Sequence, residues 1–251
     1  MQNAEKKCAV KKCAMEKSSV TEKVFMSLTG LFLCLFLVVH LGGNLLLFKQ
    51  DGGAAFNAYS HFMETSWIIR VIEIFLLLFF LTHIFMAIKL TIKNKQARPV
   101  SYAVNKASEN SSWFSRNMEI TGGVIFIFLC VHLYNFMFSQ RFFHHYPSMY
   151  AAVRTVFQNP WYVLFYVICL SWVGFHLIHG VQSSFQSLGL RHPIFTPWIK
   201  KLGVLFAALI FLGFLSLPVY FFFSRTSRRN VQSAISHQLK IENGFKRGAS
   251  Q

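Results

Sequence analysis

Five long apolar blocks, separated by shorter polar and basic stretches, set the pattern of this chain. They run over about 24–48, 67–92, 117–139, 160–188 and 200–223. Each block reaches the roughly 20 residues that an α-helix needs to cross a bilayer. The pattern therefore predicts an all-α membrane protein with five transmembrane helices, whose two termini lie on opposite sides of the membrane.

Polar segments flank this membrane domain. We expect residues 1–23, with six lysines, to form a basic cytoplasmic tail, residues 24–223 to form the five-helix domain, and residues 224–251 to form a polar C-terminal tail. A short apolar core followed by a small-residue cleavage site does not precede the first block, so a cleavable signal peptide is not expected.

Composition and charge agree with a membrane protein. Of the 251 residues, 54% are hydrophobic and 14% are charged, against about 25% charged in soluble domains. The net charge of +16 falls in tails and loops, which indicates lipid headgroups and a docked protein as neighbours, and no nucleic acid. Fifteen Lys and Arg lie on the side of the N-terminus and four on the other side, before the C-terminal tail adds six. The N-terminus is therefore predicted to be cytoplasmic, although the C-terminal tail breaks the rule.

A repeated motif links the first and third blocks. Thr29-Gly30 is followed by nine residues and then His40-Leu41, and Thr121-Gly122 is followed by nine residues and then His132-Leu133. Such a repeat indicates a duplicated scaffold. A histidine inside a membrane span is a functional site by default, because a polar ring is costly in hydrocarbon. The Thr-Gly pairs have an alternative interpretation as helix-packing sites.

Four histidines lie at matched depths. His40, His83, His132 and His176 each lie 15 or 16 residues into their block, or ~24 Å along a helix at about 1.5 Å per residue. Consecutive helices run in opposite directions, so His40 and His132 share an outer level, while His83 and His176 share an inner level. A single such histidine could simply bond a neighbouring helix, but four in a repeated frame favour two binding sites.

Two facing imidazoles at one depth suit a b-type haem, which they would bind through neutral ring nitrogens. The first four helices are thus expected to form a bundle around two stacked haem levels. With both axial positions filled, the chemistry is one-electron transfer. C-x-x-C-H is not found in the sequence, so covalent c-type haem is not expected. Glycines that would let a flat macrocycle approach the helices are Gly30, Gly42, Gly43, Gly122, Gly123, Gly174 and Gly180.

The fourth block offers two histidines, and the repeat selects between them. His132 follows His40 by 92 positions and His176 follows His83 by 93, whereas His179 would give 96. We therefore expect His176 to be the ligand and His179 to line the haem pocket or to bond a propionate.

These residues carry a resemblance to a known family. The chain resembles the di-haem cytochrome b membrane subunit of succinate dehydrogenase and fumarate reductase over roughly residues 20 to 222. The segments that carry it are TGLFLCLFLVVH at 29–40, THIFMAI at 82–88, SSWFSRNM at 111–118, VHLYNF at 131–136 and FHLIHGVQSSFQSLG at 175–189. The last is similar to the family's His-x-x-[Asn/His]-Gly signature, whose first histidine binds haem, and this independently favours His176.

The resemblance implies a complex in the bacterial cytoplasmic membrane. A flavoprotein subunit would interconvert succinate and fumarate, and an iron–sulfur subunit would pass electrons to this chain. Electrons would reach a quinone, menaquinone in the di-haem branch, through the two b haems. The haem nearer the catalytic subunits would be the inner one. A succinate site is not expected in this chain. Some fumarate reductases of the family carry a carboxylate two residues before the fourth-block ligand, where this chain has Gly174.

Quinone chemistry moves protons, and two carboxylates on the outer side are candidates to carry them. Glu64 precedes the second block, and Glu73 lies six residues past Trp67, ~9 Å deep at about 1.5 Å per residue. A carboxyl group at that depth tends to be neutral or paired. The alternatives are a solvated loop residue for Glu64 and packing against a polar helix face for Glu73.

Three other functions remain open at this point. A di-haem quinol cytochrome of a hydrogenase or formate dehydrogenase would use the same four histidines. A histidine-bearing metal transporter would normally need carboxylates and broken helices near the midplane, and Glu73 is the acidic residue placed well inside a block. A haem-free membrane anchor would not need the histidines.

Overall fold

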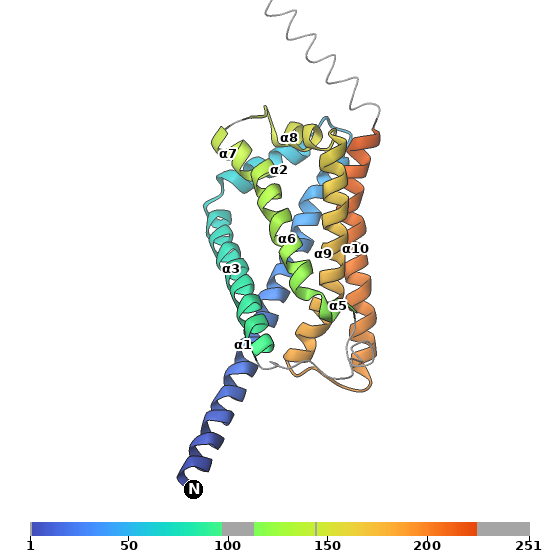
Figure 1. Cartoon of the computed structure of the whole chain (residues 1–251). Helices are drawn as coiled ribbons and strands as arrows, with labels where there is room; N and C mark the ends of the chain where they lie inside the picture. Colours follow the sequence, from blue (N-terminus) through green and yellow to red (C-terminus); the bar gives the residue numbers. More distant parts are fainter. Residues whose placement is uncertain (1, 97–112, 144, 225–251) are drawn as a thin grey trace, which may run out of the picture.

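The computed structural model describes residues 2–96, 113–143 and 145–224, with the backbone alone for residues 2–19 and 114. Within these ranges the chain is helical and has no strand (Figure 1). Five helical segments are long and apolar enough to span a membrane: Val20–Phe48, Trp67–Gln96, Met118–Phe143, Pro160–Ser187 and Phe195–Phe223. The predictions of an all-α class and of five spans are both confirmed.

The spans form a bundle around one central helix. The long helices are α1 (Gln2–Asn44), α3 (Trp67–Gln96), α6 (Met118–Leu133), α9 (Pro160–Ser187) and α10 (Phe195–Phe223). Helix α9 packs against α1, α6 and α10, whereas α3 packs mainly along α1. The fifth span is thus part of the bundle, since α10 lies along α9 and also touches α1.

The first helix begins earlier than the sequence pattern predicted. Within the expected tail at 1–23, the chain is already helical from Gln2, and this part of α1 extends beyond the bundle (Figure 1). The physical reason lies in the local sequence, which has no glycine or proline before Gly30. Its many Lys, Glu and Ala residues are good helix formers, so the span continues without a stop signal. Helix α10 likewise begins at Phe195, five residues before the expected Lys200.

The two outer loops contain helices of their own. The short helix η1 (Leu45–Phe48) ends just before the loop at 49–66, which contains α2 (Ala54–Thr65). The loop at 140–159 contains α8 (Met149–Val156). Backbone N–H groups of Ala55 and Gly53 donate to the Asp51 carboxylate, which lowers the pKa of Asp51 below its ordinary value and begins α2. These elements close the outer end over a core whose buried members include Leu47, Phe56, Val153, Phe157, Tyr166, Leu217 and Phe221.

The third span is interrupted just past its histidine. After α6 comes a π-helical turn, Tyr134–Phe138, and then α7 (Ser139–Phe143). A π-turn is uncommon and often marks a functional site. The turn accommodates an extra residue directly after Leu133, within the span Met118–Phe143. A short helix, α5 (Trp113–Arg116), precedes α6 at the inner end.

Candidate cofactor site

The structure brings the two outer-level histidines together from different helices. His40 on α1 and His132 on α6 have ring centroids 5.8 Å apart, and their planes stand at 88°. Aromatic rings surround this pair: Phe36, Phe128, Phe136, Tyr166 and Phe214. Spaced 92 positions apart in the sequence, the two residues meet in space because α1 and α6 both lie against α9.

The inner-level histidines form a second pair. His83 on α3 and His176 on α9 have ring centroids 6.5 Å apart at 68°. His179 lies half-buried on α9, three residues beyond His176. The ring of His176 is thus the one that lies beside His83, while the choice of His176 as a ligand stays a prediction.

Both separations suit an atom held between two imidazoles. A transition metal bonds an imidazole nitrogen at about 2 Å, and the nitrogen lies about 1 Å from the ring centre. A metal bonded to one nitrogen of each ring would therefore place the two ring centroids about 6 Å apart. The observed 5.8 and 6.5 Å lie on either side of this value. Direct packing of the two rings would also bring them to this range, so further features of the site are needed.

Three features show that the residues present fit a haem. The Nδ1 atom of His132 is buried and has no hydrogen-bond partner among the described residues. A Cβ atom added at Gly122 or Gly180 would meet no atom within 4 Å, although both glycines are half-buried. Helix α3 carries His83 yet makes few contacts with α6 or α9. A flat macrocycle needs this kind of room beside its ligands.

Not every expected glycine serves that purpose. A Cβ atom at Gly43 would lie 2.5 Å from the Tyr59 ring, so Gly43 makes room for a tyrosine. A Cβ atom at Gly174 would contact Phe211 at an ordinary 3.5 Å. Gly30 lies against His83, whose Cε1 would be 3.3 Å from an added Cβ.

Two buried threonines touch the inner pair, a contact that the sequence analysis did not foresee. Oγ1 of Thr29 lies 3.2 Å from Nδ1 of His83, and Oγ1 of Thr121 lies 3.0 Å from Nδ1 of His176. These are the threonines of the repeated Thr-Gly motif. The spacing of the motif could have indicated this contact. A threonine eleven residues before an outer histidine lies about 16 Å from it along the helix axis, which places the threonine at the inner level.

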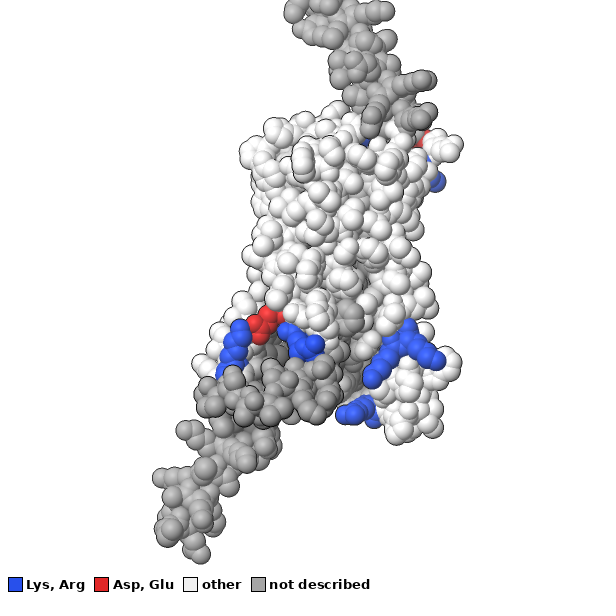
Figure 2. Space-filling view, turned by 45° about the vertical axis from the view of Figure 1, so that its right-hand side comes forward, with Lys and Arg blue, Asp and Glu red and all other residues white. Residues whose placement is uncertain are grey.

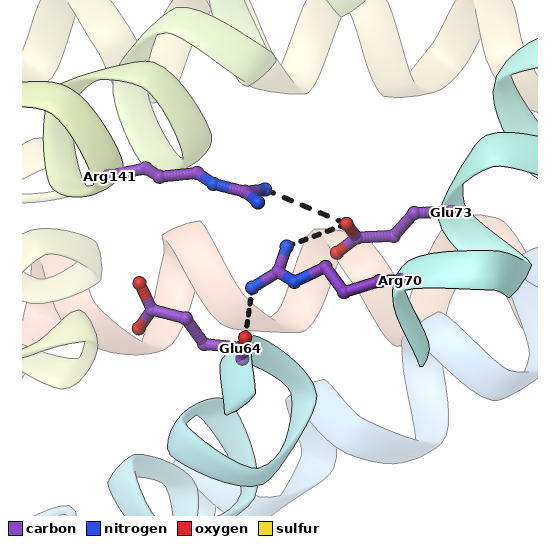
Figure 3. Close-up of polar contacts among 4 residues, drawn as sticks. All are labelled: Glu64, Arg70, Glu73 and Arg141. Atoms are coloured by element: carbon purple, nitrogen blue, oxygen red, sulfur yellow. Dashed lines mark hydrogen bonds and ion pairs between the residues drawn. The ribbon is translucent and has the colours of Figure 1, made fainter. Parts of the chain in front are cut away.

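The two candidate carboxylates lie near each other at the outer end but differ in their surroundings (Figure 3). Glu73 forms ion pairs with Arg70 at 2.7 Å and with Arg141 of α7 at 3.6 Å. The backbone carbonyl of Glu64 accepts a hydrogen bond from Arg70, while the Glu64 carboxylate turns away from Glu73 (Figure 3). Glu73 is therefore paired, one of the two states expected for it.

A polar cleft of about 280 Å³ opens beside the π-turn. Asn135 and Ser139 line it and are both buried. Asn135 Nδ2 donates to the hydroxyl of Tyr166, whose ring lies 6.2 Å from that of His132. The hydroxyl of Ser139 has no partner among the described residues. The sequence analysis did not predict this cleft, although the VHLYNF segment that it singled out contains Asn135.

Basic residues gather at the inner end of the bundle (Figure 2). There, the buried Glu22 of α1 bonds Lys89 at 2.9 Å and Lys93 at 2.6 Å on α3. Lys95 pairs with Glu119 at 2.7 Å. These ion pairs tie α1 and α6 to the end of α3. The basic segment at 93–116 separates the second and third apolar blocks, and most of it lies outside the described residues, as does the C-terminal tail from residue 225.

The fold and the site together define a five-span helical membrane protein with two histidine pairs inside the bundle, at separate levels. Residues 93–215 match the family model of the succinate dehydrogenase/fumarate reductase transmembrane subunit. This match, over 123 of the 251 residues, agrees with the family resemblance that the motifs carry. The matched residues include His132 and His176. Comparison with curated proteins and with solved structures gives no match.

Proposed function

We propose that this chain anchors a succinate dehydrogenase or fumarate reductase in the membrane and carries electrons between its iron–sulfur subunit and membrane quinone, through two b haems. The single observation that carries this proposal is the pair of cross-helix histidine contacts, at 5.8 and 6.5 Å, in a chain that matches the model of this family. The chemistry of succinate and fumarate belongs to the flavoprotein subunit.

The histidines have assigned roles in this proposal. His40 and His132 hold the outer haem, His83 and His176 hold the inner haem, and His179 lines the inner pocket. Each pair of histidines would hold one haem, which would supply one-electron transfer. The aromatic rings around His40 and His132 keep water away from the outer level. The protein thus orients the ligands and sets the polarity around each of them.

We place the N-terminus and the basic inner end in the bacterial cytoplasm, where the iron–sulfur subunit docks. The charge bias of the loops supports this orientation, and Figure 2 shows the basic side chains at that end. A cysteine introduced at the exposed Lys200, in a chain freed of its own five cysteines, checks it. An impermeant thiol reagent outside intact cells should label a cysteine at the exposed His61 and leave position 200 unlabelled. The reverse pattern would contradict this topology.

Glu64 and Glu73 are our candidates for handling quinone-linked protons near the outer haem, with menaquinone as the quinone. Their surroundings favour different roles. Two arginines pair with the Glu73 carboxylate, and the pair with Arg141 ties α3 to α7. The Glu64 carboxylate is exposed and has no ion pair among the described residues, so it is the better candidate to carry protons.

The partners of the chain provide the test of this function. Gentle purification through a tag on this chain should bring down a flavoprotein and an iron–sulfur subunit, with succinate-to-quinone activity in the same fraction. Co-purification with hydrogenase or formate dehydrogenase subunits instead would assign the chain to another respiratory complex. A chain that purifies alone and carries metal ions without haem would favour transport.

A further inference from the structure

We propose that Thr29 and Thr121 are positioning residues that hold His83 and His176 in the tautomer with the proton on Nδ1, so that each Nε2 presents its lone pair to a metal. This inference rests on the proposed haem function, and it concerns the inner level alone. It assigns a role to the repeated Thr-Gly motif that the four ligands do not explain.

The geometry is the same in both halves of the repeat. Each threonine is buried, with 3% and 1% of the surface of Thr29 and Thr121 exposed. Each lies on the helix that carries an outer histidine and contacts an inner histidine on another helix, at 3.2 Å and 3.0 Å. One motif thus serves both levels, with its histidine at the outer level and its threonine at the inner level.

Counting protons identifies the donor in these contacts. A hydroxyl has one proton to donate, and inside a helix it is commonly donated to a carbonyl one turn earlier. The Thr29 hydroxyl lies 3.0 Å from the carbonyls of Phe25 and Met26. The Thr121 hydroxyl lies 3.0 Å from that of Met118. With those protons engaged, the threonine oxygens accept from the rings, so each Nδ1 carries the hydrogen.

The assignment also fixes the state of the second nitrogen of each ring. Since a neutral imidazole carries one ring proton, Nε2 is left with a lone pair. Gly30 completes the arrangement, because an added Cβ would lie 3.3 Å from Cε1 of His83.

The histidines of the outer level have no such contact with a threonine among the described residues. Nδ1 of His132 is buried with no hydrogen-bond partner. The hydrogen bonds thus distinguish two ligand pairs that look alike in the sequence. A hydrogen bond from Nδ1–H makes the imidazole a more basic ligand. A more basic ligand stabilises ferric over ferrous iron, so these threonines should lower the reduction potential of the inner haem.

The test compares Thr29→Val, Thr121→Val and the double variant in the intact complex with Thr29→Ser and Thr121→Ser. Valine keeps the branched shape without the acceptor, and serine restores the hydroxyl. Thr65→Val is a matched control, since the Thr65 hydroxyl makes the same bond to the His61 carbonyl at 2.8 Å in an exposed helix end. The inner haem is identified by the spectral component lost in His176→Ala.

We expect each valine variant to raise the midpoint potential of the inner haem and to change its low-spin electron paramagnetic resonance signal. A tenfold change in the ferric-to-ferrous equilibrium corresponds to about 59 mV for one electron. Loss of such a partner typically weakens metal binding by about 10–100-fold, so haem retention at the inner level should fall as well. The outer haem, the serine variants and Thr65→Val should stay at the wild-type values.

A measurement without haem separates this inference from the proposed function. In chain produced without haem and labelled with ¹⁵N in its histidine rings, solid-state NMR should show Nδ1 protonated at His83 and His176. In the valine variants it should show mixed tautomers. Protonated Nε2 at either residue in the wild-type chain would overturn the inference, even if two haems bind. Valine variants with unchanged inner potential and haem retention, or with equal shifts of both haems, would also overturn it.

Discussion

Replacing His176 with alanine should leave the purified complex with half of its haem. The remaining haem should have the spectrum of the outer level, because neither of its ligands lies on α9. The ring centroids of His40 and His132, on α1 and α6, are 5.8 Å apart. His83→Ala should remove the same component, whereas His40→Ala and His132→Ala should each remove the other one. Haem content per chain and the α-band of the reduced-minus-oxidised spectrum measure the result.

The control for this series lies one turn away. His179→Ala should keep both haems, since the ring of His176, and not that of His179, pairs with His83 in the structure. His61→Ala, on the exposed surface of α2, should behave in the same way. Retention of two haems after His176→Ala, with loss of one after His179→Ala, would show that the fourth span uses the other histidine.

Glu64→Gln should sharply reduce quinone-linked turnover while haem content and succinate-to-dye activity stay unchanged. Glutamine keeps the size of the side chain but cannot exchange a proton, and general acid–base groups typically contribute about 10²–10⁴-fold to a rate. Glu73→Gln should have a smaller effect, through the loosened contacts with Arg70 and Arg141. The comparison of the two variants is matched, because both change one carboxylate to an amide in the same outer cluster.

Outcomes for this pair separate proton handling from structure. A loss in Glu73→Gln that is matched by an equal loss in Arg141→Gln would indicate a role in holding α3 to α7. Full quinone activity in both variants would contradict the assignment of these carboxylates to proton handling. The site would then be sought near the inner haem, as the remaining place close to a histidine pair.

The five spans and the histidine pairing could be predicted because two strong physical rules govern them. A membrane span needs about 20 apolar residues, and a histidine in such a span stands out against its neighbours. Depth along a helix follows from 1.5 Å per residue, so His40 and His132, or His83 and His176, could be matched without knowing how the helices pack. The structure adds that α9 is the central helix.

Other parts of the site depend on contacts that no local pattern carries. The sequence shows Thr29 and Thr121 beside their glycines, but their hydrogen bonds run to histidines 54 and 55 positions away. The π-turn after Leu133 rests on packing around Asn135, which bonds Tyr166 on α9. The helical start of α1 was missed because six lysines were interpreted as a solvated tail, although lysine is a good helix former.

The central claim, that electrons pass through two b haems in this chain, is tested most directly by adding succinate to the purified complex. The visible spectrum is recorded before and after succinate and again after a menaquinone analogue, alongside haem content per chain. We expect two low-spin b haems per chain, of which succinate reduces at least the inner one and the quinone analogue reoxidises it. A complex that turns over succinate but contains no haem, or whose haem stays unchanged in both steps, would contradict the claim.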